Sequence, residues 1–219
     1  VHNDDTSMTV LAVLKEGRDE EGRRGVFTTA VLSRVDGRTV ALYATGRQHA
    51  GENLGDLLAL RPPGLGPPIQ MCDALERNLP DGLATIVSNC LVHMRRQFVD
   101  VAEAFPTEVR RVLDELADVY RVEAAARGLS PQARLALHQA HSGPVMDRLA
   151  LFLAELLDEK RVEPSSGLGK AIAYAQKRWD RLTLFLRVPG APLDNNACEQ
   201  VLKRAILHRK NSLFYKTQN

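Results

Sequence analysis

Apolar and β-branched positions in the first part of the chain are spaced as in strands. A short apolar run covers Met8–Leu14, and β-branched residues are frequent in Val26–Val35. The dipeptide Asp36-Gly37 is typical of a tight hairpin, and Thr39–Ala44 follows it. The pattern therefore predicts an antiparallel meander of three strands, with a charged turn at Asp19–Arg24.

Helical and strand signals alternate in the segment that follows. His49–Leu60 carries leucines at mostly helical spacing, which predicts a helix. Prolines and glycines after Leu60 end that helix. Two short apolar runs, Ile69–Cys72 and Ala84–Val87, are then candidates for buried strands.

From Leu91 onward the apolar positions repeat with the period of an α-helix. Stripes of this kind cover residues 91–105, 109–120, 145–157 and 168–186. Ser130-Pro131 has the composition of a helix start. Gly143-Pro144 is expected to interrupt the helical stretch, which resumes at Val145.

One further helix closes the chain, because Pro189–Pro192 ends the last stripe and Asp194 can cap a helix that runs to about His208. Three antiparallel strands followed by alternating α and β elements form the ribonuclease-H-like order. The predicted fold class is α/β, a ribonuclease-H-like mixed sheet with a large α-helical insertion before the last core helix. We expect the first part of the core at 1–106, the helical insertion at 107–187, and the last core helix with a truncated carboxyl-terminal end at 188–219.

The composition limits the classes of protein to which the chain can belong. Hydrophobic residues make up 44% and charged residues 26% of the 219 residues, as in ordinary globular proteins. No apolar run suits a membrane span, and 3 cysteines favour a reducing, cytoplasmic compartment. A net charge of +2 neither demands nor excludes nucleic acid. Since the chain starts at Val1 without a signal-like segment, we expect a piece of a longer polypeptide.

Three acidic residues stand out by their positions. Asp4 lies in the first strand region, Asp73 directly follows Ile69–Cys72, and Glu199 lies one turn into the final helix. Open α/β sheets bind ligands at the carboxyl ends of strands. Two Mg²⁺ ions about 4 Å apart, held by such carboxylates, stabilise the attacking and leaving oxygens at phosphorus. Taken alone, these acids also fit three unrelated surface carboxylates.

Cationic residues cluster in two segments. His93 and Arg96 share one side of the helix that follows Cys90, where they can meet phosphate. The carboxyl-terminal stretch interleaves cations with Phe214 and Tyr215, a pattern that suits nucleic acid but also occurs on solvated faces. The cationic residues and the histidine of that stretch are Lys203, Arg204, His208, Arg209, Lys210 and Lys216.

Four ordered motifs resemble those of the transposases of the insertion sequence 66 family. His2-Asn3-Asp4-Asp5-Thr6 resembles the family's H-x-D-E-T opening, and Cys90–Phe98 resembles its C-W-x-H-x-R-R-x-F motif. Leu193–Glu199 matches D-N-N-x-x-E, and Arg209–Phe214 matches R-K-N-x-L-F. The motifs span nearly the whole chain, and the last two are the most specific.

This resemblance implies a DDE-type DNA transposase with a ribonuclease-H-like core. Asp4, Asp73 and Glu199 would form the catalytic triad and bind two Mg²⁺ (or Mn²⁺) ions for phosphodiester cleavage and strand transfer. The implied partners are DNA, as transposon ends and target, and further copies of the full-length chain in a nucleoid-associated homo-oligomer. Asp5 replaces the family's Glu and competes with Asp4 for the first position, and Ala74-Leu75 replaces a Gly-Tyr pair.

The basic pattern and the resemblance together assign supporting roles. The candidates for DNA contacts are His93, Arg95, Arg96, Lys203, Arg204, Arg209 and Lys210. Asp194, Asn195 and Asn196 would support the triad. The alternative function is a catalytically inactive transposase remnant that binds DNA or a partner.

Several other residues have side chains that could bind a metal. The cysteines and two histidines near the acids are Cys72, Cys90, Cys198, His2 and His93. Only Cys90-x-x-His93 has the spacing of a zinc-ligand pair, so buried small side chains are the preferred interpretation of the cysteines. His138 and His141 lack the glutamate partners of a di-iron site. Trp179 lies on an apolar stripe, which predicts a core position.

Overall fold

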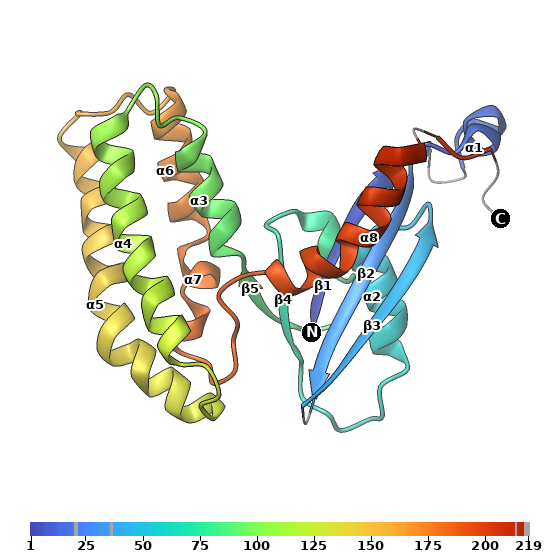
Figure 1. The fold of residues 1–219 in the computed structure, drawn as a ribbon, viewed down its shortest axis with the longest axis horizontal. Coiled ribbons are helices and arrows are strands. Elements are labelled where there is room, and N and C mark those ends of the chain that lie inside the picture. The colour runs from blue at the N-terminus through green and yellow to red at the C-terminus, as the bar shows by residue number, and fades with distance from the viewer. Residues whose placement is uncertain (20–21, 36, 213, 217–219) are drawn as a thin grey trace. The chain divides into compact units, whose positions relative to one another are not determined.

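The computed structural model describes residues 1–19, 22–35, 37–212 and 214–216. The chain forms two compact units (Figure 1). The sheet unit comprises Val1–Val87 and Asn195–Asn219, and the helical unit comprises Ser88–Asp194. This mixed α/β structure agrees with the predicted class. Within the described ranges, no helix combines the length and the hydropathy that a membrane span requires.

The sheet unit is built on a five-stranded mixed sheet with the order β3-β2-β1-β4-β5. The strands are β1 (His2–Met8), β2 (Val26–Val35), β3 (Arg38–Gly46), β4 (Ile69–Cys72) and β5 (Ile86–Asn89). β1 pairs antiparallel with β2, from His2 opposite Leu32 to Met8 opposite Val26. β1 also pairs parallel with β4, so the strand that carries Asp4 is paired on both edges.

The hairpin predicted around Asp36-Gly37 is confirmed. Val35 pairs with Arg38, so two residues connect β2 and β3. Gly37 has a φ of 74°, a conformation that glycine adopts without strain in a type I′ turn. Asp36 lies outside the described residues.

The first strand is not the predicted one. The apolar run Met8–Leu14 was expected as a strand, whereas the first strand is His2–Met8 and Leu11–Glu16 forms the short helix α1. Hydrophobic periodicity does not reveal β1 because most of its side chains are polar. Val13 of α1 instead packs near Val26 in a small apolar cluster.

Two helices cover opposite faces of the sheet (Figure 1). They are α2 (Ala50–Ala59) and α8 (Asn196–Ser212), so the last helix runs past the predicted end at His208. Cys198 and Leu202 of α8 are buried against Ala30 of β2. On the other face, a Cβ at Gly51 of α2 would clash with the carbonyl oxygens of residues 77 and 79, so glycine permits this close approach.

The helical unit packs its helices around an apolar core. It contains α3 (Leu91–Val99), α4 (Pro106–Ala125), α5 (Pro131–Asp158), α6 (Gly167–Lys177), α7 (Trp179–Leu182) and the 3₁₀ helix η2 (Leu184–Leu186). α4 and α5 form an antiparallel pair (Figure 1). The predicted stripes are buried, as Leu116, Leu149 and Ile172 show with at most 1% of their surface exposed.

Three predictions about helix continuity were wrong. The stripe at 91–105 is not one helix, since α3 ends at Val99 and turns follow it. α5 passes through Pro144 without a break, because one missing N–H is offset by the buried residues Val145 and Met146 that follow it. The stripe at 168–186 is not one helix, since Arg178 has a φ of −116° and separates α6 from α7. The apolar residues after Arg178 therefore do not continue the buried face of α6. Trp179, the first of them, is half-buried rather than part of the core.

A buried polar cluster joins α4 to α5. His138, with 0% exposure, is hydrogen-bonded through Nε2 to Glu123 (2.8 Å) and through Nδ1 to the Ser142 hydroxyl (2.9 Å). Arg134 donates to the same carboxylate at 2.9 Å. Burial raises the pKa of Glu123, but the hydrogen bonds from His138 and Arg134 outweigh it and hold that pKa below its usual value. The hydrogen bonds of His138 therefore give it a structural role between α4 and α5.

Candidate active site

Asp4 and Asp5 point to opposite faces of β1, because successive side chains of a strand alternate. Asp4 lies on the face covered by α8, where its charge acts on Cys198. Its Oδ1 accepts a hydrogen bond from the Asp5 backbone N–H at 2.9 Å. Asp5 lies on the α2 face, where its Oδ2 is 3.0 Å from His49 Nδ1. The two neighbouring carboxylates therefore have different surroundings.

Burial raises the pKa of Asp4 to about 7, and the neighbouring carboxylates of Asp73, Asp5 and Glu199 add to the increase. A carboxylate resists ionisation when it is removed from water and faces other negative charges. Asp4, Asp73 and Glu199 therefore form one electrostatic cluster within the sheet unit, although they are far apart in sequence.

Asp73 directly follows β4 and is held by its own loop. Its Oδ1 accepts hydrogen bonds from the Leu75 backbone N–H at 3.1 Å and from Asn78 Nδ2 at 2.5 Å. Asn78 belongs to the 3₁₀ helix η1 (Glu76–Asn78). One Asp73 oxygen is therefore fixed by the protein.

A buried network of amide side chains joins β1, β4 and η1. Asn3 and Gln70 are 0% exposed and Asn78 is 1% exposed. Gln70 Nε2 donates to Asn3 Oδ1 at 2.9 Å, and both side chains donate to the Asn78 carbonyl at 2.7 Å. Thr85 donates to Gln70 Oε1 at 2.7 Å, so the network extends to the segment before β5. These bonds fix the strand of Asp4 relative to the loop of Asp73.

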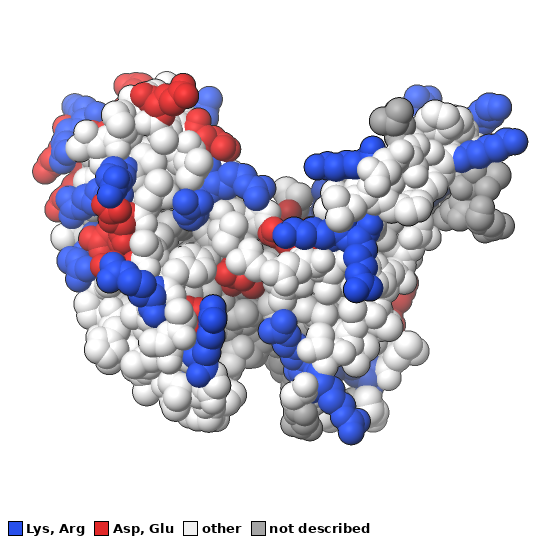
Figure 2. All heavy atoms as spheres, viewed as in Figure 1, with Lys and Arg blue, Asp and Glu red and all other residues white. Residues whose placement is uncertain are grey.

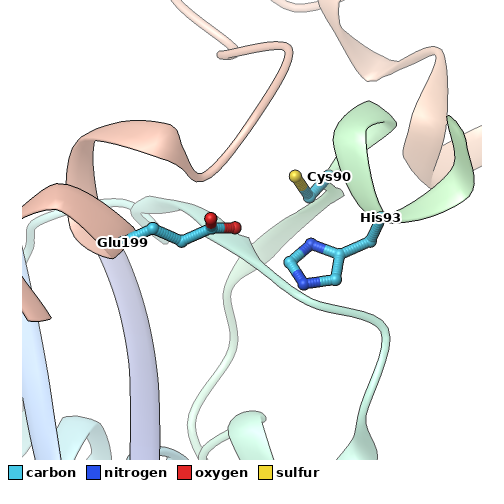
Figure 3. Close-up of side chains that lie close together, drawn as sticks. All are labelled: Cys90, His93 and Glu199. Atoms are coloured by element: carbon cyan, nitrogen blue, oxygen red, sulfur yellow. The ribbon is translucent and has the colours of Figure 1, made fainter. Parts of the chain in front are cut away.

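Asn195 fixes the start of α8 to β1. The Asn195 side chain is 0% exposed, and its Nδ2 donates to the Asn3 carbonyl at 3.2 Å. Its Oδ1 lies 3.1 Å from His2 Nδ1, so the imidazole donates there. Burial, followed by the charge of the Val1 ammonium, lowers the pKa of His2 to about 4. Glu199 projects from the next turn of α8 (Figure 3).

Cys198 lies on the inner side of α8 beside these carboxylates. Burial raises the pKa of its thiol to about 12, and the charges of Asp4 and Glu199 raise it further. The thiol donates to the Ala30 carbonyl at 3.4 Å. The side chain is therefore a neutral packing group, as the sequence interpretation of the cysteines proposed.

Asp5 has several polar partners on the α2 face. Besides His49, its Oδ2 accepts from the Ala50 backbone N–H at 3.3 Å, and its Oδ1 is 3.4 Å from Arg77. Only 2% of the Asp5 side chain is exposed. Asp5 therefore links β1 to the start of α2 and to η1.

The order of these acids and the D-N-N-x-x-E segment at the start of α8 agree with a match over the whole chain. The sequence model of the family described as "Transposase IS66 family" matches residues 1–219. The chain belongs to the IS66 family of transposases. No solved structure matches it.

Three proteins of Sinorhizobium fredii (strain NBRC 101917 / NGR234) are similar to this IS66-family chain. The uncharacterized protein y4jD is 39% identical over 127 residues, which are 57% of this chain and 24% of that protein. The uncharacterized protein y4hP is 27% identical over 243 aligned positions, which cover 100% of this chain and 41% of that protein. The chain therefore spans less than half the length of the curated relatives it matches.

The helical unit holds the second motif of the IS66-family resemblance. Cys90 and His93 lie at the start of α3 (Figure 3), and Cys90 is buried. Arg95 and Arg96 are exposed on the same helix. Asp194, at the end of the helical unit, acts on Tyr120 of α4, whose pKa is raised first by burial and then by the Asp194 charge. The cap predicted at Asp194 lies one residue too early, since α8 begins at Asn196.

The predicted DNA contacts of the sheet unit lie on α8. Lys203, Arg204 and Lys210 are exposed, and the side chain of Arg209 lies outside the described residues. In Figure 2, Lys and Arg side chains predominate over this helix, whereas both signs of charge mix over the visible face of α4 and α5. Asn196 is exposed at the first position of α8.

Sequence reasoning missed the residues that support the acids. The sequence assigns no role to Gln70 and Asn78, places Asn3 only within the opening motif, and suggests His2 only as part of that motif and as a candidate zinc ligand. Gln70 carries a weak signal, because it is a polar residue within the short apolar strand Ile69–Cys72. Its partners are not evident from the sequence, since Asn3 is 67 positions away.

Proposed function

We propose that the chain is the catalytic part of a DNA transposase that cleaves and joins phosphodiesters with a triad of Asp4, Asp73 and Glu199. The observation that carries the proposal is the raised pKa of Asp4, which burial and the charges of Asp73 and Glu199 produce. The strand order β3-β2-β1-β4-β5, antiparallel over its first three strands, supports a ribonuclease-H-like core. We further propose residues 107–187 as an insertion before its last helix.

The donor set fits two Mg²⁺ or Mn²⁺ ions. Three carboxylates offer the oxygen ligands that hard divalent cations prefer. Within the described part of the chain, Asp4 and Asp73 form no ion pair with Lys or Arg, whereas Asp5 pairs with Arg77. Asp4 therefore suits the first position of the triad, because Asp5 is already paired with Arg77.

When bound, the two ions would stabilise charge on the attacking and leaving oxygens at phosphorus. The protein's own contribution is placement. Asn78 holds one oxygen of Asp73, and Asn195 fixes the helix of Glu199 to the strand of Asp4. Lys203, Arg204, Arg209 and Lys210 of α8 would contact the DNA backbone and orient the scissile phosphate beside the acids, and His93, Arg95 and Arg96 of α3 would add further phosphate contacts.

The test is metal-dependent cleavage of DNA that carries the transposon ends. Glu199→Gln keeps the size of the side chain and removes one negative charge. We expect this variant to reduce the cleavage rate at least about 1,000-fold, because charge stabilisation at the reacting centre is lost. DNA binding should remain within about twofold of wild type, since no cation is removed.

Glu103→Gln is the matched control, because it makes the same change at an exposed position of the helical unit. It should cleave at the wild-type rate. Undiminished cleavage by Glu199→Gln would refute the catalytic role. Wild-type protein that binds DNA but never cleaves it would favour the inactive, DNA-binding alternative.

A further inference from the structure

Most cations of α4 and α5 are neutralised by ion pairs within the helical unit. The pairs are Arg110 with Asp114, Arg121 with Asp118, Arg134 with Glu123, and Arg148 with Glu115. Both signs of charge are interspersed on this surface (Figure 2). Paired charges of this kind keep a helical surface soluble and attract anions weakly.

The segment from α6 to η2 has a different charge pattern. Residues 167–191 contain five cations and the single acid Asp180. The cations are Lys170, Lys177, Arg178, Arg181 and Arg187. Within the described ranges, none of these five forms an ion pair with a carboxylate. Their positive charge is therefore not offset by the protein.

Helical geometry brings the cations of α6 to one face. Lys170, Tyr174 and Lys177 follow the spacing i, i+4, i+7, which is one side of a helix. The opposite side, with Leu168 and Ile172, is fully buried. Lys170 and Lys177 are exposed, and their separation of seven positions corresponds to about 10 Å along the helix axis.

Two arginines of the segment 167–191 are held in place by uncharged partners. The Arg178 guanidinium lies 4.2 Å from the centre of the Tyr174 ring. Arg187 donates from Nη1 to the hydroxyl of the buried Thr183 at 3.0 Å and from Nη2 to the Asp180 carbonyl. Contacts with a ring, a hydroxyl and a carbonyl order the side chains but leave their charges in place. The cations are therefore partly preorganised for an anionic partner.

We propose that the cations of the segment 167–191, which we call the α6 face, bind the sugar–phosphate backbone of double-stranded DNA. They are Lys170 and Lys177 of α6, Arg178 at its end, and Arg181 and Arg187 in the residues that follow. The proposal rests on the proposed function, which supplies DNA as the partner. About 10 Å of cationic helix matches the axial rise of about three base pairs. An acidic protein fits less well, because protein interfaces have apolar centres and the one aromatic ring on the α6 stripe is already covered by Arg178.

The test removes three unpaired cations, in the variant Lys170→Gln/Lys177→Gln/Arg181→Gln. Their side chains are exposed and, in the described part of the chain, form no ion pair with a carboxylate, so the helical content should not change. Binding of a fluorescent duplex of random sequence is measured by anisotropy between 50 and 200 mM salt. We expect at least about tenfold weaker binding at low salt, and a log–log salt slope that is smaller by about 2 to 3, because each phosphate contact contributes about 0.9.

The matched control is Arg110→Gln/Arg121→Gln/Arg148→Gln, which removes the same charge from paired positions of α4 and α5. It should bind DNA within about threefold of wild type, since only the long-range field changes. Equal losses in both variants would overturn the proposal, because net charge alone would then explain binding. An unchanged slope in the α6-face variant, or a wild-type chain that shows no salt-dependent binding, would also overturn it.

This readout is separate from catalysis. Glu199→Gln should keep the wild-type salt slope even though it loses cleavage. If Glu199→Gln still cleaves, the catalytic proposal fails while the α6-face result stands. If the α6-face variant binds normally and Glu199→Gln is inactive, the α6 face fails and the triad stands.

Discussion

Residue by residue, the site brings the negative charges of Asp73 and Glu199 close to the buried Asp4. Asp4 has a pKa of about 7 because it is buried and faces other carboxylates. Its neighbour Asp5, on the opposite face of the same strand, is balanced by His49 and Arg77. Of these two neighbouring carboxylates, Asp4 has no cationic partner among the described residues, and such a difference is typical of functional sites.

Asn195 gives a direct residue-scale prediction. Asn195→Ala removes two hydrogen bonds and leaves His2 Nδ1 and the Asn3 carbonyl without this partner in the core. We expect the free energy of unfolding to fall by about 1–3 kcal/mol, the usual cost of unsatisfied buried polar groups. Urea denaturation followed by circular dichroism measures it.

Gln200→Ala is the control, because Gln200 is exposed on the same helix. Its unfolding free energy should stay within about 0.5 kcal/mol of wild type. Equal stability of Asn195→Ala and wild type would show that Asn195 does not fix α8 to β1.

The acids could be proposed from the sequence because motif spacing identifies them. Asp4, Asp73 and Glu199 each lie in or beside a recognisable segment. The amides that hold them could not be proposed in the same way. A buried Gln70 finds its partners Asn3 and Asn78 only after β1 and β4 have paired, and single polar residues carry no signal of a distant partner.

At the scale of elements, periodicity predicted the buried helices and missed the polar strand. The stripes at 109–120 and 145–157 lie in α4 and α5, since a helix must bury one face. β1 has no such stripe, because the strand is stabilised by pairing on both edges and by bonds to its polar side chains. The break predicted at Pro144 is absent from α5 for a related reason, because tertiary packing overrides a local helix breaker.

The packing of α4 against α5 depends on the buried imidazole of His138. His138→Ala removes the bonds to Glu123 and Ser142 and leaves a cavity beside Phe185, whose ring is 5.0 Å from the His138 ring. We expect the free energy of unfolding to fall by about 2–4 kcal/mol from the lost bonds and packing. Thermal or urea unfolding measures the change.

His141→Ala is the matched control on the same helix, because His141 is exposed. Its stability should stay within about 0.5 kcal/mol of wild type. If the two histidine variants lost the same stability, the buried cluster would not be what joins the two helices.

For the whole molecule, the family membership and the mixed α/β class agree with what the sequence predicts, while the ribonuclease-H-like core and the roles of residues are proposals. Four motifs and a family match over 1–219 assign the chain to IS66 transposases. The net charge of +2 does not reveal how charge is distributed along the chain. Cations predominate in α8 and in the α6 face, whereas the cations of α4 and α5 are mostly paired with acids. Only the structure distinguishes paired from unpaired cations, because ion pairing depends on contacts between helices.

The central claim is that Asp4, Asp73 and Glu199 together bind divalent cations, and calorimetric titration with Mn²⁺ tests it most directly. We expect about two ions per wild-type chain, and loss of at least one ion or about 100-fold weaker binding in Asp4→Asn and in Glu199→Gln, because each removes a ligand oxygen charge. Asp81→Asn, an exposed acid of the same unit, should bind as wild type does. Unchanged stoichiometry and affinity in both triad variants, with their folds intact by circular dichroism, would contradict the account.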